Sequence, residues 1–220
     1  MNRRMDMDKH KMKWTLRIII VLSVFIILLF LGTFSAGVLS PFPYLELDSF
    51  KGKVIDAETK KPVAGAAVLA VYFKEVYTVA GSNSLAIDAQ EALTDDRGEF
   101  IIPGTKRWFV SRRGYTDGKL TIFKRGYGTF PRHTLSKAIG EKYKSWPTPE
   151  KYIVYEIPGL KTRVERSRNA FDTDIDYRLP YELQKLIIKE VNREFKRLGL
   201  LDRYIEKEGN TILTLEEKSK

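Results

Sequence analysis

The sequence predicts a mainly β protein, in which a β-sandwich is preceded by a transmembrane helix and followed by an amphipathic helix. Three observations predict this arrangement. A run without any charged residue extends from Ile18 to Leu45. Between residues 49 and 157, short strand-like runs alternate with turn sequences, which is typical of all-β sandwiches. Apolar residues then repeat at helical spacing from Leu179 to Leu198.

The composition argues against most catalytic chemistry. The chain of 220 residues has no cysteine and a net charge of +10. Disulfides, thiolate metal sites and cysteine nucleophiles are therefore excluded. The only histidines are His10 and His133, too few for the usual zinc sites or for Ser-His catalysis. We expect no catalytic residue, no metal, no cofactor and no enzyme activity.

The apolar run is long enough to cross a bilayer. Its most hydrophobic part is Ile18 to Leu31, and a less hydrophobic part continues to Leu39. Together they give roughly the 20 residues that a membrane helix needs. The positive-inside rule keeps a basic leader in the cytoplasm, and the leader here carries Arg3, Arg4, Lys9, Lys11, Lys13 and Arg17. We therefore expect a cytoplasmic leader at 1–17, a single membrane span at 18–39, and the rest in the periplasm or on the cell surface.

A cleaved signal peptide is the alternative for this segment. Ser35 and Gly37 are small residues at suitable spacing for cleavage. The long basic leader, and apolar character beyond Leu31, favour a retained signal anchor. With either reading the domain lies outside the cytoplasm, so nucleic acid is not expected as a partner.

The sandwich is expected over residues 49–160, after a tether at 40–48 that contains Pro41 and Pro43. Gly81 to Ser84 is expected to interrupt the strands. β-Branched and aromatic residues between turn sequences predict strands at Ser49–Asp56, Ala66–Val79, Ile87–Thr94, Glu99–Pro103, Lys119–Lys124 and Tyr152–Ile157.

Three sequence elements within this region occur in a characteristic order. They are Gly52-x-Val54-x-Asp56-x-x-Thr59-x-x-Pro62-Val63-x-Gly65-Ala66-x-Val68, Thr94-Asp95-x-x-Gly98-x-Phe100-x-Ile102-Pro103 and Lys124-Arg125-Gly126-Tyr127. Together they resemble the signatures of the carboxypeptidase regulatory-like domain. The resemblance implies a transthyretin-like (prealbumin-like) sandwich, one of the carbohydrate-binding-like folds. It also implies a non-catalytic role, because this domain accompanies the catalytic domain of carboxypeptidases.

The signature residues themselves are predicted to shape turns. Gly65 and Gly98 suit a positive φ, which other residues adopt at a cost. The side chains of Asp56 and Asp95 are placed to accept hydrogen bonds from turn amides.

The strand at Ala66–Val79 is apolar on both faces. Val68, Ala70 and Tyr72 point one way, and Leu69, Val71 and Phe73 point the other. A sheet face in contact with water is normally polar, so a further element should cover this strand.

The helix from Leu179 to Leu198 is the candidate cover within an appendage at 161–220. Pro180 suits its first turn and Gly199 its end. Its apolar stripe consists of Leu183, Leu186, Ile187, Val191, Phe195 and Leu198. The alternative is a helix that binds a partner or a membrane surface. Thr211–Leu215 is expected to add an edge strand.

The segment from Lys106 to His133 is the candidate ligand-binding region, because basic and aromatic residues alternate in it. It could hold an anionic polymer or lipid head groups. The alternative is a long loop with packed aromatic residues and solvated charges. The candidate ligand-binding residues are Arg107, Trp108, Arg112, Arg113, Lys124 and Arg125.

Two acidic features remain. Asp172 to Asp176 resembles the start of a calcium loop, but Tyr177 and Leu183 stand where an EF-hand needs Gly and Glu. We therefore expect a solvated approach to the helix there. Glu156 and Glu165 are isolated carboxylates that form no recognisable catalytic pair.

The expected function is a non-catalytic, membrane-anchored envelope protein that acts as a scaffolding or interaction module. The alternative is a protein that binds carbohydrate or an anionic glycan. Expected partners are the membrane, other envelope proteins and anionic polysaccharide.

Overall fold

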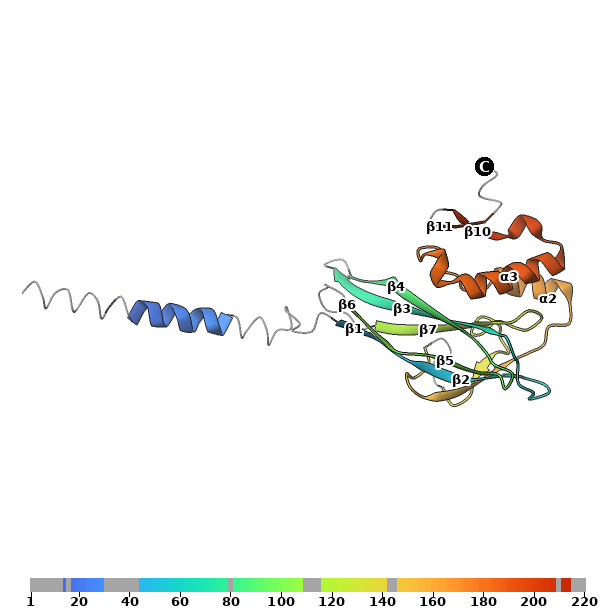
Figure 1. The fold of residues 1–220 in the computed structure, drawn as a ribbon, viewed down its shortest axis with the longest axis horizontal. Coiled ribbons are helices and arrows are strands. Elements are labelled where there is room, and N and C mark those ends of the chain that lie inside the picture. The colour runs from blue at the N-terminus through green and yellow to red at the C-terminus, as the bar shows by residue number, and fades with distance from the viewer. Residues whose placement is uncertain are drawn as a thin grey trace, which may run out of the picture. The chain divides into compact units, whose positions relative to one another are not determined.

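A computed structural model describes residue 14 and residues 17–29, 44–78, 81–108, 116–141, 146–208 and 211–214 (Figure 1). The chain divides into two compact units. The smaller unit contains a helix at residues 17–29, and the larger contains the sandwich strands and the C-terminal helices.

The helix at residues 17–29 exposes its apolar residues. Its large hydrophobic side chains, which begin at Ile18 and end at Leu29, are 44% to 66% exposed. Among the described residues, no helix combines the length and the apolar character that crossing a bilayer requires. Residues 30–39 of the predicted span lie outside the described part of the chain.

The larger unit contains two sheets, and the prediction of a mainly β protein is confirmed. The first has the order β5-β2-β9-β8, formed by Glu99–Ile102, Phe50–Asp56, Tyr152–Ile157 and Lys137–Ala138. The second has the order β4-β3-β7, formed by Gly81–Leu93, Ala67–Thr78 and Thr116–Phe123. Strand β2 pairs antiparallel with β5 and parallel with β9. A separate pair joins β1 (Tyr44–Leu47) to β6 (Thr105–Trp108).

Strand β3 contributes to two hydrophobic cores, as its pattern predicts. Val68, Ala70 and Tyr72 belong to the core that includes residues of both sheets, Val54 and Leu120 among them. The alternate residues of the strand belong to a second core, which also contains residues of the C-terminal helices. The strand is therefore covered on both faces.

The predicted interruption at Gly81–Ser84 is wrong. These residues are the first part of β4, and they pair with β3 from Thr78 back to Glu75. The long antiparallel ladder supplies backbone hydrogen bonds whatever the side chain, so small polar residues continue the strand there.

The signature turns have the predicted geometry. The φ angles of Gly65 and Gly98 are 64° and 75°. Asp56 Oδ1 accepts from the amides of Glu58 at 2.9 Å and Thr59 at 2.7 Å. In the same way, Asp95 Oδ1 accepts from the amides of Arg97 at 2.9 Å and Glu99 at 2.8 Å. These signature residues shape the turns.

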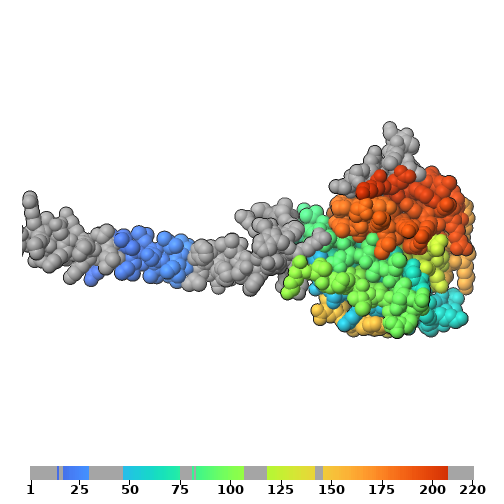
Figure 2. All heavy atoms as spheres, in the orientation of Figure 1, coloured from blue at the N-terminus to red at the C-terminus, as the bar shows by residue number. Residues whose placement is uncertain are grey.

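The C-terminal appendage covers the outer face of the sheet β4-β3-β7 (Figures 1 and 2). Its elements are α2 (Arg163–Phe171), η1 (Tyr181–Leu183), α3 (Lys185–Leu198), η2 (Leu201–Arg203), β10 (Ile205–Glu208) and β11 (Thr211–Thr214). Ile187, Val191 and Phe195 of α3 share the second core with Leu69 and Val71 of β3. The predicted docking of this helix is confirmed.

In the appendage, the predicted start of the helix is wrong, and the strand predicted at Thr211–Leu215 is present but lies outside the sandwich. The helix begins at Lys185 instead of Leu179, because the buried Gln184 side chain bonds to the backbone of Asp176, where it accepts at 2.9 Å and donates at 2.8 Å. Strand β11 is no edge strand of the sandwich, since it pairs with β10 in a separate hairpin.

A side chain of the sheet caps α3. The residue before the helix, Gln184, makes no side-chain cap. Instead, Glu91 of β4 accepts from the amides of Leu186 and Ile187, both at 2.8 Å. These amides have no partner within the helix, so Glu91 ties the start of α3 to the sheet.

This cap should make the stability of the domain depend on pH. Burial raises the pKa of Glu91 from 4.5 to about 7, although the two amides oppose the shift. The group is protonated in both states below about pH 4.5. As the pH rises from about 4.5 to 7, Glu91 ionises in the unfolded chain but stays protonated in the folded one. The free energy of unfolding should therefore fall as the pH rises, by about 2 kcal/mol after allowance for solvent screening.

Urea unfolding between pH 4 and 8 measures this effect when it is compared with Glu91→Gln, which keeps one acceptor and cannot ionise. As the pH rises from about 4.5 to 7, the protein with Glu91 should lose stability relative to the Glu91→Gln variant. A constant difference across this range would contradict the assignment to Glu91.

Candidate ligand-binding pocket

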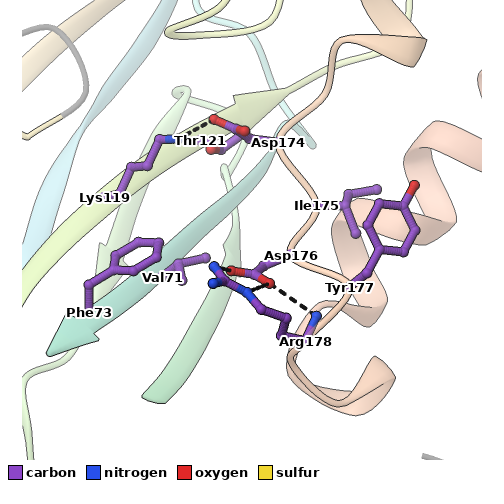
Figure 3. A pocket seen from close by; sticks show the side chains of 9 residues that line it. All are labelled: Val71, Phe73, Lys119, Thr121, Asp174, Ile175, Asp176, Tyr177 and Arg178. Carbon is purple, nitrogen blue, oxygen red and sulfur yellow. Dashed lines mark hydrogen bonds and ion pairs between the residues drawn. The ribbon is translucent and has the colours of Figure 1, made fainter. Parts of the chain in front are cut away.

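A pocket of about 440 Å³ lies between the outer face of strands β3 and β7 and the linker that joins α2 to η1 (Figure 3). The linker crosses the sheet because Thr173 and Leu179 are buried near its two ends and Ile175 packs against the second core. The lining residues are Val71, Phe73, Lys119, Thr121, Asp174, Ile175, Asp176, Tyr177 and Arg178.

One end of the pocket is closed by a charged cluster on Asp174. Lys119 of β7 forms an ion pair with its carboxylate (Figure 3), and Arg132 Nη2 donates to its Oδ1 at 2.6 Å. Burial alone would raise the pKa of Asp174, but the hydrogen bonds and charges of Arg132 and Lys119 hold it below its ordinary value. Asp174 therefore stays ionised and fixed.

A second pair lies in the same pocket. Arg178 donates to Asp176 through Nε at 2.9 Å and through Nη2 at 2.6 Å. The hydrogen bond from Arg178 lowers the pKa of Asp176 more than burial raises it. Such a bidentate pair has one preferred plane, so donors and acceptors are held in fixed positions.

The floor of the pocket, formed by Val71 and Phe73 of β3, is apolar. Val71 is 5% exposed, and Phe73 packs edge-to-face against Trp146 with ring centroids 5.7 Å apart. The pocket thus combines an aromatic and aliphatic floor with charged groups above it. That combination is typical of small-molecule sites.

The structure describes four of the six candidate residues of the basic segment. Arg107 and Trp108 belong to β6, and Arg112 and Arg113 lie outside the described residues. Lys124 and Arg125 are described, and neither lines this pocket.

Arg125 joins the sheet to the appendage, whereas the hydrogen bond of Lys124 stays within the sandwich. Lys124 Nζ donates to the carbonyl of Gly65 at 3.1 Å, and burial lowers the pKa of this lysine. Arg125 Nε lies 3.2 Å from Glu190 Oε2 on α3, and Arg193 pairs with the same carboxylate. The alternative of a long loop with solvated charges is wrong for this part, since Thr116–Phe123 is strand β7 and Lys119, Arg125 and Arg132 make ion pairs.

The acidic features also have partners. Asp174 and Asp176 of the calcium-like run are paired with basic side chains, as described above. Glu156 is not isolated: it lies 2.6 Å from Lys60 Nζ and 3.1 Å from Lys137 Nζ. In the described part of the chain, no group of three or more His, Cys, Asp or Glu residues could hold a metal ion.

Helix α2 was not predicted, although the sequence carries a signal for it. Thr162 Oγ1 accepts from the amide of Glu165, and the Glu165 carboxylate accepts from the amide of Thr162, both at 3.1 Å. This is a capping box, which Thr-x-x-Glu signals in a sequence. Glu165 is therefore a capping residue of α2.

The pairing of Lys119 with Asp174 has no such signal. The two residues lie far apart in the sequence, and only the docked appendage brings them together.

Comparisons with known proteins give little further information. No family model and no curated protein matches the chain. An alternative pilotin from the type II secretion system of Vibrio cholerae is 13% identical over 54% of this chain and 99% of its own, with a TM-score of 0.27. A 9R-lipoxygenase from Cyanothece PCC8801 is 13% identical over 68% of this chain and 23% of its own, with a TM-score of 0.23. Neither likeness carries an argument about function.

Proposed function

We propose that this chain is a non-catalytic envelope protein, in which an N-terminal anchor holds a binding domain outside the cytoplasm. The observation that carries the proposal is the helix at residues 17–29, whose apolar side chains are exposed along its length. Exposure of that much apolar surface to water is unfavourable. A bilayer removes it from water, and the predicted span at 18–39 gives the required length.

The charges before this helix support the orientation. The basic residues of the leader, from Arg3 to Arg17, precede the apolar run, and a basic flank stays in the cytoplasm. The larger unit then lies in the periplasm or on the cell surface.

The carboxylates of the larger unit favour binding over catalysis. Asp174, Asp176 and Glu156 hold ion pairs that lower their pKa values, whereas a general acid or base works best with a pKa near the operating pH. Glu91 has such a pKa, but both of its oxygens accept amides of α3. Its role is structural.

The fold proposed for the domain is the transthyretin-like sandwich of carboxypeptidase regulatory-like domains. Two observations support it: the two stacked sheets, and the turn-shaping roles of Asp56, Gly65, Asp95 and Gly98 within the matched signatures. The resemblance therefore implies a non-catalytic domain, because such domains accompany a separate catalytic domain.

Reporter fusions test the topology. Alkaline phosphatase fused at Gly209 should be active, and a cytoplasmic reporter at the same site should be silent. The matched control is a fusion at Lys13, before the span, which should give the opposite result. In alkaline carbonate extraction, the full-length chain should stay with the membrane. Reversed reporter activities would refute the orientation, and release of a shortened chain would show a cleaved signal peptide.

A further inference from the structure

We propose that the pocket of Figure 3 binds an uncharged carbohydrate, one or two sugar rings of a neutral glycan. The proposal rests on the proposed function as an extracytoplasmic binding domain and names its ligand class. Three properties of the pocket carry it: an apolar floor, fixed polar groups around that floor, and charges that are already neutralised.

The floor suits the face of a sugar ring. Val71 and Phe73 are alternate residues on the outer face of β3, and both line the pocket. Trp146 packs against Phe73 at an interplanar angle of 66°, which fixes the phenyl ring. A pyranose ring presents several C–H groups on one face, and such a face packs well on an aromatic ring.

The polar groups suit hydroxyls. An arginine has five N–H donors, and Arg178 directs two of its side-chain groups, Nε and Nη2, at Asp176. Its remaining N–H bonds are open to a ligand, since 60% of the side chain is exposed. The paired carboxylate and guanidinium therefore offer acceptors and donors side by side, as neighbouring hydroxyls require.

The charge balance favours a neutral ligand over an anionic one. The charged residues that line the pocket are two cations, Lys119 and Arg178, and two carboxylates, Asp174 and Asp176, so their charges sum to zero. Lys119 is paired with Asp174, and Arg178 is paired with Asp176. An anion would have to compete with these fixed carboxylates. A hydroxyl can bond to both partners of a pair without separating them. This differs from the sequence expectation of an anionic polymer on the segment from Lys106 to His133.

Calorimetric titration of the full-length chain in mild detergent tests the proposal. The probes are neutral hexasaccharides of glucose, N-acetylglucosamine and mannose, with a sulfated hexasaccharide as the anionic probe. At least one neutral probe should bind more tightly than the sulfated one. Its affinity should change little between about 50 and 300 mM salt, because no net charge is neutralised.

Matched variants place the binding in this pocket. Phe73→Ala should weaken the neutral probe about three- to tenfold, the size expected for loss of one aromatic contact, while Tyr152→Ala, an exposed aromatic on the other sheet, should not. Arg178→Ala should weaken it about tenfold. Its control is Arg97→Ala, since Arg97 also pairs with an aspartate two residues earlier, Asp95.

Unfolding midpoints of each variant are measured alongside. Should Phe73→Ala fail to fold, the exposed Arg178 decides the result. Binding of the sulfated probe alone, binding of no neutral probe, or equal affinities of Arg178→Ala and Arg97→Ala would each overturn the proposal. The reporter fusions are independent: an anchored, extracytoplasmic domain that binds no neutral sugar overturns only the ligand class, whereas a cytoplasmic domain overturns the proposed function itself.

Discussion

Phe195→Ala should lower the free energy of unfolding of the domain by about 3–5 kcal/mol. Phe195 is 2% exposed and belongs to the core between α3 and the sheet. Its ring also contacts Phe171 of α2, with centroids 5.2 Å apart. Truncation therefore removes contacts to two elements and leaves a cavity. Chemical denaturation followed by circular dichroism measures the loss, which is a large part of the stability of a typical domain.

Lys189→Ala is the matched control on the same helix. Lys189 is exposed, and the expected change is within about 0.5 kcal/mol. Equal unfolding free energies for the two variants would mean that the stripe of α3 serves a partner and does not stabilise its own sheet.

Arg166→Leu should have a comparable effect, for an electrostatic reason. Arg166 donates to Glu194 through Nε at 2.7 Å and Nη2 at 2.8 Å, and this pair joins α2 to α3. The side chain of Glu194 is only 2% exposed. Loss of Arg166 leaves a buried carboxylate without its cation, which costs about 3–5 kcal/mol.

The double variant Arg166→Leu with Glu194→Leu separates the two contributions. Because both charges are then removed, most of the lost stability should return. Lys161→Leu is the control for an exposed pair, since Lys161 and Glu58 lie 3.4 Å apart at the surface, and it should change the free energy of unfolding by less than about 1 kcal/mol. A double variant as unstable as Arg166→Leu would show that the pair itself, and not the uncompensated charge, stabilises the helices.

The sequence predicted those parts of the fold that depend on periodicity. The two-sided apolar pattern of β3 predicted a covering element, and the stripe of α3 identified it. The signature turns were equally predictable, because Asp56 and Asp95 act on amides within a few residues of themselves.

The parts that escaped prediction depend on contacts between distant residues. Nothing in the local sequence connects Glu91 to the amide of Ile187, so the cap of α3 was not predicted. Asp174 likewise pairs with Lys119 only because the linker that carries Asp174 packs against the sheet. The pocket is formed by this linker with β3 and β7, so its charged residues could be read from the sequence, but their arrangement could not.

The covering of β3 by α3 has a consequence for biosynthesis. The ribosome makes β3 well before α3, and β9, which pairs with β2, is also made after β3. Before α3 is made, Leu69 and Val71 lack the helix that buries them. Incomplete chains therefore present an apolar sheet face, the kind of surface on which nascent proteins aggregate. Folding of this domain therefore requires that face to be shielded until α3 has been made.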